Sequence, residues 1–189
     1  MDDFTVYGDD FQQALDNFKK VLVRCKETNL SLSHEKSIMM LTEGIVLGHH
    51  ISGTRIRVDP AKIDIISQIK IPSSQKEIRS FLGHAGYYRR FIQNFTNLAS
   101  PLFKLLTKDA KFCWDEQCQI SFEILKTKLS SAPALRGPNW SLPFHICTDA
   151  SDTTLGDVLG QREGNIPFSI YFISKNLSPT EANYTVTEK

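Results

Sequence analysis

Two pairs of adjacent carboxylates near the start of the chain are the residues best suited to catalysis. These pairs are Asp2-Asp3 and Asp9-Asp10. Two-metal phosphoryl transfer needs carboxylates at a tight turn, so that they reach both divalent ions. In a hairpin a strand should follow that turn, and the β-prone run 4–7 follows Asp2-Asp3. A long helical pattern follows Asp9-Asp10, which suits a helix N-cap. The sequence therefore favours a catalytic metal site at Asp2 and Asp3.

A second candidate site lies on a helix that is predicted to open at Ser74, the first residue of a capping box that ends at Glu77. One face of this helix is apolar and predicts a core contact: Ile78, Phe81, Leu82, Ala85, Tyr88 and Ile92. The opposite face holds three cations, a glycine and an aromatic ring: Lys76, Arg79, Gly83, Tyr87 and Arg90. Cations suit phosphates, and a tyrosine beside a glycine suits a shallow groove. This face therefore predicts nucleic-acid binding. The alternative is a solvated face on which Gly83 permits close helix packing.

The charge is unevenly distributed along the chain. Residues 55–111 carry 11 basic and 4 acidic side chains, a net +7, while 1–54 and 112–189 each carry a net −3. Such asymmetry favours a polyanionic partner, although an uneven solvated surface would give the same count. No apolar run is long enough for a membrane span or a signal peptide. We therefore expect an intracellular protein, cytoplasmic or nuclear and not secreted, with no membrane partner.

The remaining pattern predicts the elements that must position these residues. We expect a short strand over 4–7, a strand or turn at 31–33 and 38–41, and a hairpin of 44–48 with 49–52 that closes at Gly53. Helices are predicted over 11–28, from Pro60, from Ser74 and over 115–130, followed by a linker over 131–143. Three strands are predicted over 144–148, 155–160 and 168–173. The fold class is therefore α+β.

Read in order, the motifs resemble the reverse transcriptase and ribonuclease H region of the Pol polyprotein of gypsy-class LTR retrotransposons. Residues 1–8 resemble the end of the acidic polymerase motif, 47–52 the primer-gripping hairpin and 78–92 the thumb helix. Residues 112–133 resemble the entry into the ribonuclease H domain, and 148–161 resemble its first hairpin. The resemblance implies the C-terminal part of a palm with its primer-grip hairpin over 1–54 and a helical thumb over 55–111. Residues 112–189 would be the truncated N-terminal part of a ribonuclease H-like α/β domain.

The resemblance also implies roles for individual residues. Asp2 and Asp3 would bind Mg²⁺ as polymerase carboxylates, and Asp149 would be the first metal carboxylate of ribonuclease H. Gly48 and His49 would hold the primer end. The helix face with Gly83 and Tyr87 would track the minor groove of a primer–template duplex or an RNA/DNA hybrid. The complete enzyme would be an RNA-directed DNA polymerase and a ribonuclease H, and the rest of the Pol polyprotein would be a further partner.

Departures from the family pattern leave the activity of the chain open. A third polymerase carboxylate and a nucleotide pocket are not found in it, and the ribonuclease H glutamate would fall either at Glu188 or on the next residue after Lys189. We therefore expect no turnover from the chain alone. A non-catalytic nucleic-acid-binding module and a decayed retrotransposon remnant are the alternatives. Asp157 stands where the family favours a small apolar residue, and a buried, unpaired carboxylate there would be costly.

Overall fold

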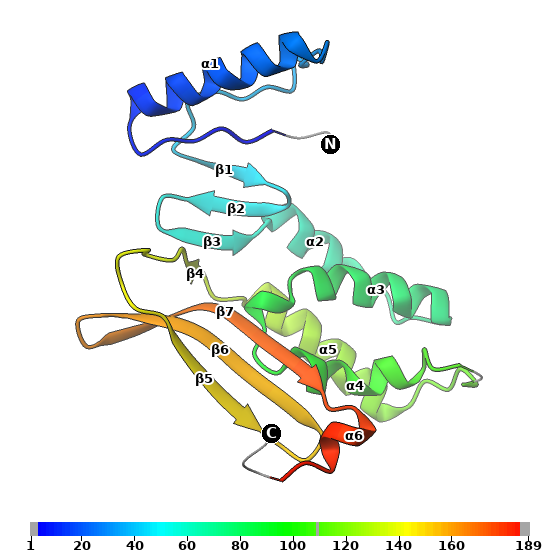
Figure 1. The fold of residues 1–189 in the computed structure, drawn as a ribbon. Coiled ribbons are helices and arrows are strands. Elements are labelled where there is room, and N and C mark those ends of the chain that lie inside the picture. Colours follow the sequence, from blue (N-terminus) through cyan, green and yellow to red (C-terminus); the bar gives the residue numbers. More distant parts are fainter. Residues whose placement is uncertain (1–3, 109, 186–189) are drawn as a thin grey trace. The chain divides into compact units, whose positions relative to one another are not determined.

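The computed structural model describes residues 4–108 and 110–185, and the chain divides into two compact units. The first unit is Met1–Thr42 and the second is Glu43–Lys189. Figure 1 shows the elements of each in chain order. The second unit holds the predicted hairpin, the basic helices and the three C-terminal strands. Compact units are not the domains of a family, so the predicted division at residues 54 and 111 stays a prediction.

The first unit contains one helix, α1 (Phe11–Glu27), as the pattern predicts. Asp10 is its N-cap, and the Asp10 carboxylate accepts a hydrogen bond from the backbone N–H of Gln13 at 2.7 Å. The predicted strand over 4–7 is wrong, because no strand in the described part of the chain pairs with it. Instead the side chain of Asn17 donates to the carbonyl of Tyr7 at 3.0 Å. This contact ties the segment before α1 to the helix.

The segment between α1 and the second unit contains no strand, so the structure has a turn at residues 34–36 and otherwise irregular backbone there. Asp2 and Asp3 lie outside the described residues, and so does Glu188. The metal role predicted for the first two is therefore untested.

The second unit opens with a four-stranded antiparallel sheet. Its strands are β1 (Glu43–Val46), β2 (His49–Ser52), β3 (Arg55–Val58) and β4 (Leu135–Arg136), adjacent in that order. The hairpin predicted here is confirmed, but its turn is Leu47-Gly48, and Gly53 lies in the next turn, between β2 and β3. The prediction of a linker over 131–143 is wrong at β4, which lies within it. A strand of two residues between prolines is too short a pattern to detect in a sequence.

A helical core lies against one face of this sheet. Its helices are α2 (Pro60–Gln68), α3 (Gln75–Tyr87), the 3₁₀ helix η1 (Arg89–Phe91), α4 (Phe95–Lys104) and α5 (Glu116–Ser130). All six residues of the predicted apolar face after Ser74 are buried. Four apolar residues of α5 are buried in the same core: Cys118, Phe122, Leu125 and Leu129. Helical periodicity therefore located the core correctly.

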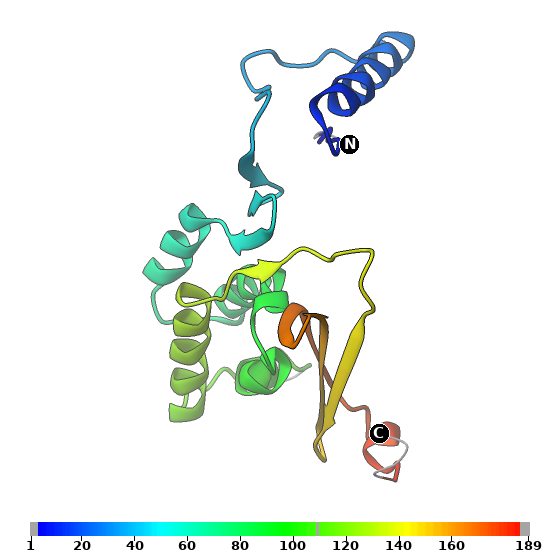
Figure 2. The ribbon, with the colours of Figure 1, turned by 90° about the vertical axis from the view of Figure 1, so that its left-hand side faces the viewer.

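A second antiparallel sheet follows, with β5 (His145–Ala150), β6 (Thr154–Glu163) and β7 (Ile166–Asn176) in that order, and then the short α6 (Pro179–Ala182). In Figure 2 the helices lie along one side of this sheet. Thr96 of α4 fixes the contact: its backbone N–H donates to Ser174 Oγ at 3.0 Å, and its hydroxyl donates to the Ser174 carbonyl at 2.9 Å. The fold is therefore mixed α and β with antiparallel sheets.

Asp157 lies in the middle of β6, between Thr148 of β5 and Ile173 of β7. Its Oδ1 atom is buried, and the described residues offer it no hydrogen-bond partner. A desolvated carboxylate oxygen without a partner destabilises the fold. The sequence-based concern about this residue therefore has a structural counterpart. No helix in the described ranges is both long and apolar enough to span a bilayer.

Candidate nucleic-acid interface

The turn between β1 and β2 is the centre of the candidate site. Leu47 and Gly48 form a two-residue loop closed by the Val46–His49 pair, and both have positive φ, 46° and 68°. Two positive φ values identify a type I′ turn, which suits the twist of a hairpin. Glycine adopts this backbone without penalty, whereas leucine does so rarely. The turn therefore needs stabilisation from elsewhere in the fold.

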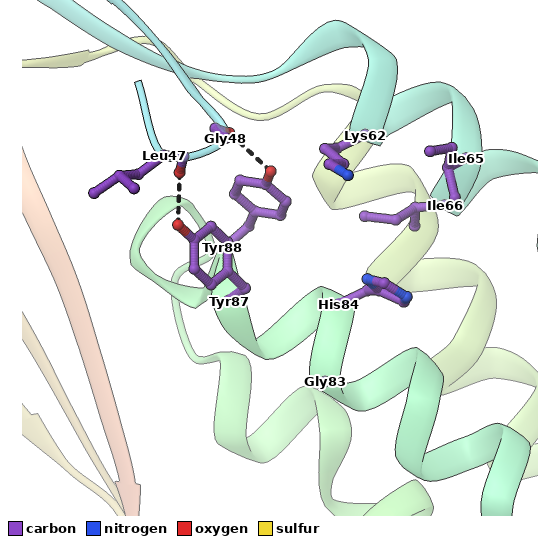
Figure 3. Close-up of a pocket in the computed structure, with 9 residues that line it drawn as sticks. All are labelled: Leu47, Gly48, Lys62, Ile65, Ile66, Gly83, His84, Tyr87 and Tyr88. Carbon is purple, nitrogen blue, oxygen red and sulfur yellow. Dashed lines mark hydrogen bonds between the residues drawn. The ribbon is translucent and has the colours of Figure 1, made fainter. Parts of the chain in front are cut away.

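That stabilisation comes from two consecutive tyrosines at the end of α3. The Tyr87 hydroxyl donates to the carbonyl of Leu47 at 2.6 Å, and the Tyr88 hydroxyl donates to the carbonyl of Gly48 at 2.8 Å. Figure 3 shows the two rings side by side beneath the turn. Tyr88 is 3% exposed, whereas Tyr87 is 54% exposed. One tyrosine therefore belongs to the core and the other to the surface, and both bind the same turn.

Burial, followed by smaller effects of the nearby Asp59 carboxylate and of Tyr87, raises the pKa of Tyr88 to about 12. The hydroxyl therefore stays protonated and remains a donor throughout the neutral range. From the sequence, Tyr88 was assigned to the core alone. The hydrogen bond to the turn could have been expected only from the general rule that a buried tyrosine usually finds a partner for its hydroxyl.

His49 follows the turn and points into the molecule. Its ring lies 5.3 Å from that of Tyr87, 5.5 Å from that of Tyr88 and 5.8 Å from that of Phe91, centroid to centroid. The Nδ1 atom lies 3.0 Å from the Leu47 carbonyl, while Nε2 is buried without a partner among the described residues. The ring therefore supports the aromatic cluster under the turn. The contact with nucleic acid predicted for His49 gains no support from this orientation.

The predicted cationic face of α3 is exposed over most of its length. Lys76, Arg79, Gly83 and Tyr87 all lie on the surface. Among the described residues, a Cβ atom built on Gly83 would meet no atom of another element within 4 Å. Gly83 therefore does not serve the close packing of a second described helix, which was the alternative explanation. We call these four residues the α3 stripe.

Arg90 does not continue the α3 stripe. The α-helix ends at Tyr87, and Arg90 lies in η1 with its guanidinium 4.7 Å from the centre of the Tyr171 ring of β7. Its Nε atom is buried and has no partner among the described residues. The prediction placed Arg90 on the exposed face of α3 because it extended the α-helix past Tyr87, where the structure ends it. Arg90 joins the helical core to the second sheet instead.

A half-open pocket of about 360 Å³ lies beside the stripe. The turn, α2 and α3 line it, and α2 contributes Lys62, Ile65 and Ile66. Gly83 and His84 form its α3 side, as Figure 3 shows. The pocket walls are mostly apolar with a cation at the rim. This combination suits the sugar and phosphate edge of a nucleic-acid strand.

Asp149 lies within β5, paired with Gly156 of β6, and is exposed. The adjacent turn is held by Ser151, whose Oγ accepts from the Thr154 backbone N–H at 3.0 Å. The described residues contain no group of three or more His, Cys, Asp or Glu side chains that could hold a metal ion. They therefore do not form a complete Mg²⁺ site around Asp149. Its predicted metal role is untested.

Known proteins resemble this chain in sequence and in fold. Residues 114–189 match the model of an RNase H-like domain found in reverse transcriptase. The whole chain is 34% identical to the Pol polyprotein of transposon opus from Drosophila melanogaster and covers 20% of it. It is 33% identical to that of transposon 412 from the same fly, covering 15%, and 32% identical to the Tf2-3 polyprotein of Schizosaccharomyces pombe, covering 14%. The relatives are retrotransposon Pol polyproteins.

The chain thus resembles the reverse transcriptase and RNase H-like region of these polyproteins and spans a fifth or less of each. Solved structures share the fold. A foamy viral protease-reverse transcriptase in complex with double-stranded DNA matches 97% of this chain and 32% of its own, with a TM-score of 0.79 and 24% identity. Another in complex with an RNA/DNA hybrid matches 95% of this chain and 24% of its own, with a TM-score of 0.77 and 23% identity.

Replacing Gly48 with alanine tests the turn. The positive φ and a Cβ placed 3.1 Å from the Tyr88 hydroxyl oxygen should both strain the variant. We expect Gly48→Ala to lower the free energy of unfolding by about 1–2 kcal/mol, measured by urea denaturation. Gly53→Ala is the matched control, since no atom lies within 4 Å of its Cβ position. Equal stability of the two variants would contradict this account.

Replacing Tyr88 with phenylalanine tests its hydrogen bond. We expect Tyr88→Phe to lose about 1 kcal/mol at neutral pH, because the Gly48 carbonyl loses its donor. Unfolded tyrosine ionises near pH 10, whereas folded Tyr88 ionises near 12. The wild type should therefore lose stability as the pH rises from 10 to 12, and its advantage over Tyr88→Phe should shrink there. Urea titrations across this range measure it, with Tyr184→Phe as control; a constant difference would refute the assignment.

Proposed function

We propose that the chain is part of a retrotransposon reverse transcriptase, in which the α3 stripe and the Leu47-Gly48 turn hold a primer–template duplex. One observation carries this proposal. Tyr87 is at once the end of the exposed stripe and the donor to the turn, with a hydroxyl-to-carbonyl distance of 2.6 Å. The helix and the hairpin are therefore joined by a hydrogen bond at the edge of the proposed surface.

The chemistry of this surface suits a duplex. Lys76 and Arg79 would bind phosphates, and Arg79 offers a planar fork of donors. Gly83 leaves the helix backbone bare, so a strand could approach closely, and the Tyr87 ring would pack against sugars in the groove. The foamy viral proteins of the same fold are described in complexes with double-stranded DNA and with an RNA/DNA hybrid. These complexes support a duplex as the ligand.

The complete protein would be an RNA-directed DNA polymerase with a ribonuclease H activity, of the gypsy class of LTR retrotransposons. Asp2 and Asp3 would serve the first activity and Asp149 the second, each with Mg²⁺. A non-catalytic nucleic-acid-binding module built on the same stripe is the alternative. It is favoured by one observation: the cations that suit phosphates, Lys76 and Arg79, are exposed, and binding through them needs no metal site.

Primer extension tests whether this chain by itself carries a working polymerase site. Because two-metal transfer needs several converging carboxylates, we expect this chain alone to show no Mg²⁺-dependent extension of a primer on an RNA template. The control is the variant with Asp2→Asn and Asp3→Asn, assayed at equal duplex occupancy. Extension by the wild type above that control would establish a working polymerase site in this chain and exclude the non-catalytic module.

Removing the two stripe cations tests duplex binding. We expect Lys76→Ser with Arg79→Ser to weaken binding of a fluorescent RNA/DNA duplex, measured by anisotropy. The slope of log affinity against log salt should fall by about two, one for each lost phosphate contact. Lys104→Ser with Lys128→Ser removes the same charge from exposed positions on other helices. Equal effects of both variants would indicate general electrostatic attraction and contradict the proposal.

Two glycines of the same helix separate stability from binding. Gly83→Ala should stabilise the fold by about 1 kcal/mol, because alanine favours a helix interior and the Cβ has room. It should nonetheless weaken duplex binding, since the bare backbone is covered. At Gly86 a Cβ would make only an ordinary contact, 3.9 Å from Phe95 Cζ. Gly86→Ala should therefore leave binding unchanged. Unaltered binding by Gly83→Ala would remove Gly83 from the interface.

A further inference from the structure

The sheet β1–β4 has a second face that the proposed duplex site does not use. Strand residues alternate between faces, and the inner side chains of β3 and β4 enter the core: Val58 and Leu135 are buried, and Ile56 packs against them. Arg55 and Arg57 alternate with these residues and are exposed. The outer face of β3 therefore consists of two arginines in succession.

The neighbours of these arginines across the sheet carry no negative charge. Arg57 is paired with His50 of β2, and Arg55 is paired with Arg136 of β4. Like charges in directly opposed positions destabilise a sheet. The guanidinium of Arg136 is satisfied, with Glu163 at 2.8 Å and the centre of the Phe168 ring at 4.1 Å.

Arg55 and Arg57 have no such partner. Within the part of the chain that the structure describes, no carboxylate lies within ion-pairing distance of either. Glu43 shares their face on the far strand β1, opposite Ser52, and Glu163 is already bound to Arg136. Two exposed guanidinium groups that form no ion pair with a described residue are complementary to a polyanion.

An exposed tryptophan lies in the loop that follows β4. Trp140 is 82% exposed, in the loop between β4 and β5. The start of this loop is tied to the β2–β3 turn, because the backbone N–H of Gly137 donates to the Thr54 carbonyl at 3.2 Å. Figure 1 shows β4 beside β3, with the loop leading from it to β5. The loop that carries the indole is therefore attached to the sheet beside the arginines.

This loop is held in place by a buried amide. Gln161 of β6 is 1% exposed, and its Oε1 accepts from the backbone N–H of Asn139 at 2.8 Å. Its Nε2 donates to the carbonyls of Asn139 at 2.7 Å and Leu142 at 2.9 Å. Three hydrogen bonds from one buried side chain thus fix the backbone on both sides of Trp140. The exposure of the indole comes from a structured loop, which lowers the entropy cost of binding.

We propose that the outer face of β3, with Trp140, binds single-stranded nucleic acid. Arg55 and Arg57 contact phosphates through their planar donor forks, and the Trp140 indole stacks on an unpaired base. The indole selects a single strand because bases inside a duplex are already stacked. The inference rests on the proposed function for the presence of nucleic acid, but it concerns a different surface. It assigns the α3 stripe to the duplex and this face to an unpaired strand.

The test uses Trp140 as its own reporter. The chain has two tryptophans, and Trp114→Phe leaves Trp140 as the single tryptophan, which can be excited selectively over the tyrosines. In this background we expect single-stranded oligothymidine to quench the fluorescence, because a stacked base contacts the indole. Trp140→Ala, made in the wild-type chain, should weaken oligothymidine binding at least about fivefold by anisotropy.

Two pairs of charge variants then locate the binding surface. Arg55→Ser with Arg57→Ser should weaken oligothymidine binding about tenfold at moderate salt and leave duplex binding nearly unchanged. Lys76→Ser with Arg79→Ser should do the reverse. Arg55 and Arg57 are exposed, so the fold should survive their replacement, and circular dichroism with urea unfolding checks this.

Each result decides the matter. Quenching together with the reciprocal loss supports the proposal. Loss of oligothymidine binding in the stripe variant alone, or equal losses in both variants, overturns it. Binding without quenching also overturns it, because it shows attraction of any polyanion, which heparin would then match. If duplex binding fails while oligothymidine binding follows Arg55, Arg57 and Trp140, the proposed duplex function fails and the single-strand site stands.

Discussion

Two hydrogen bonds from neighbouring tyrosines attach one hairpin turn to the end of α3, beside the core contacts of β3 and β4. The carbonyls of Leu47 and Gly48 point away from the hairpin ladder, in a turn that leucine rarely adopts. Tyr87 and Tyr88 satisfy both. Consecutive helical residues point about 100° apart. Tyr87 therefore reaches the turn from the surface, and Tyr88 reaches it from the core. The end of α3 at Tyr87 is therefore what joins sheet, core and candidate interface.

The sequence predicted the elements whose signals are local. Asp10 and Ser74 cap their helices as expected, and Asp115, predicted as the first residue of its helix, is its N-cap. Each has a side-chain oxygen that accepts from a backbone N–H three residues later. Elements that depend on distant partners were missed or misjudged. β4 forms by pairing with β3, from which the helices separate it in the sequence. Residues 4–7 form no strand, and no strand in the described part of the chain pairs with them. Helix caps can be predicted from neighbouring residues in a sequence, whereas strand pairing between distant segments cannot.

The same division applies to the candidate site. The exposed stripe Lys76, Arg79 and Gly83 follows from helical periodicity and was predicted correctly. Arg90 was misplaced because periodicity does not report where a helix gives way to 3₁₀ geometry, and there it packs on Tyr171 instead. The hydroxyl bond of Tyr87 could not be predicted, since its acceptor lies forty residues away. The family resemblance predicts what the site would bind, and the structure shows which contacts hold the turn and the helix end together.

The register of β2 and β3 gives one small sheet two chemically opposite faces. His49 pairs with Val58 on the inner face, under the tyrosines, while His50 pairs with Arg57 on the outer face. A slip of one residue would exchange these faces, placing an arginine in the core and His49 in solvent. The Tyr87 and Tyr88 bonds oppose that slip, because they fix the turn from which both strands are counted. The contacts that hold the proposed duplex surface therefore also set the orientation of Arg55 and Arg57 on the other side of the sheet.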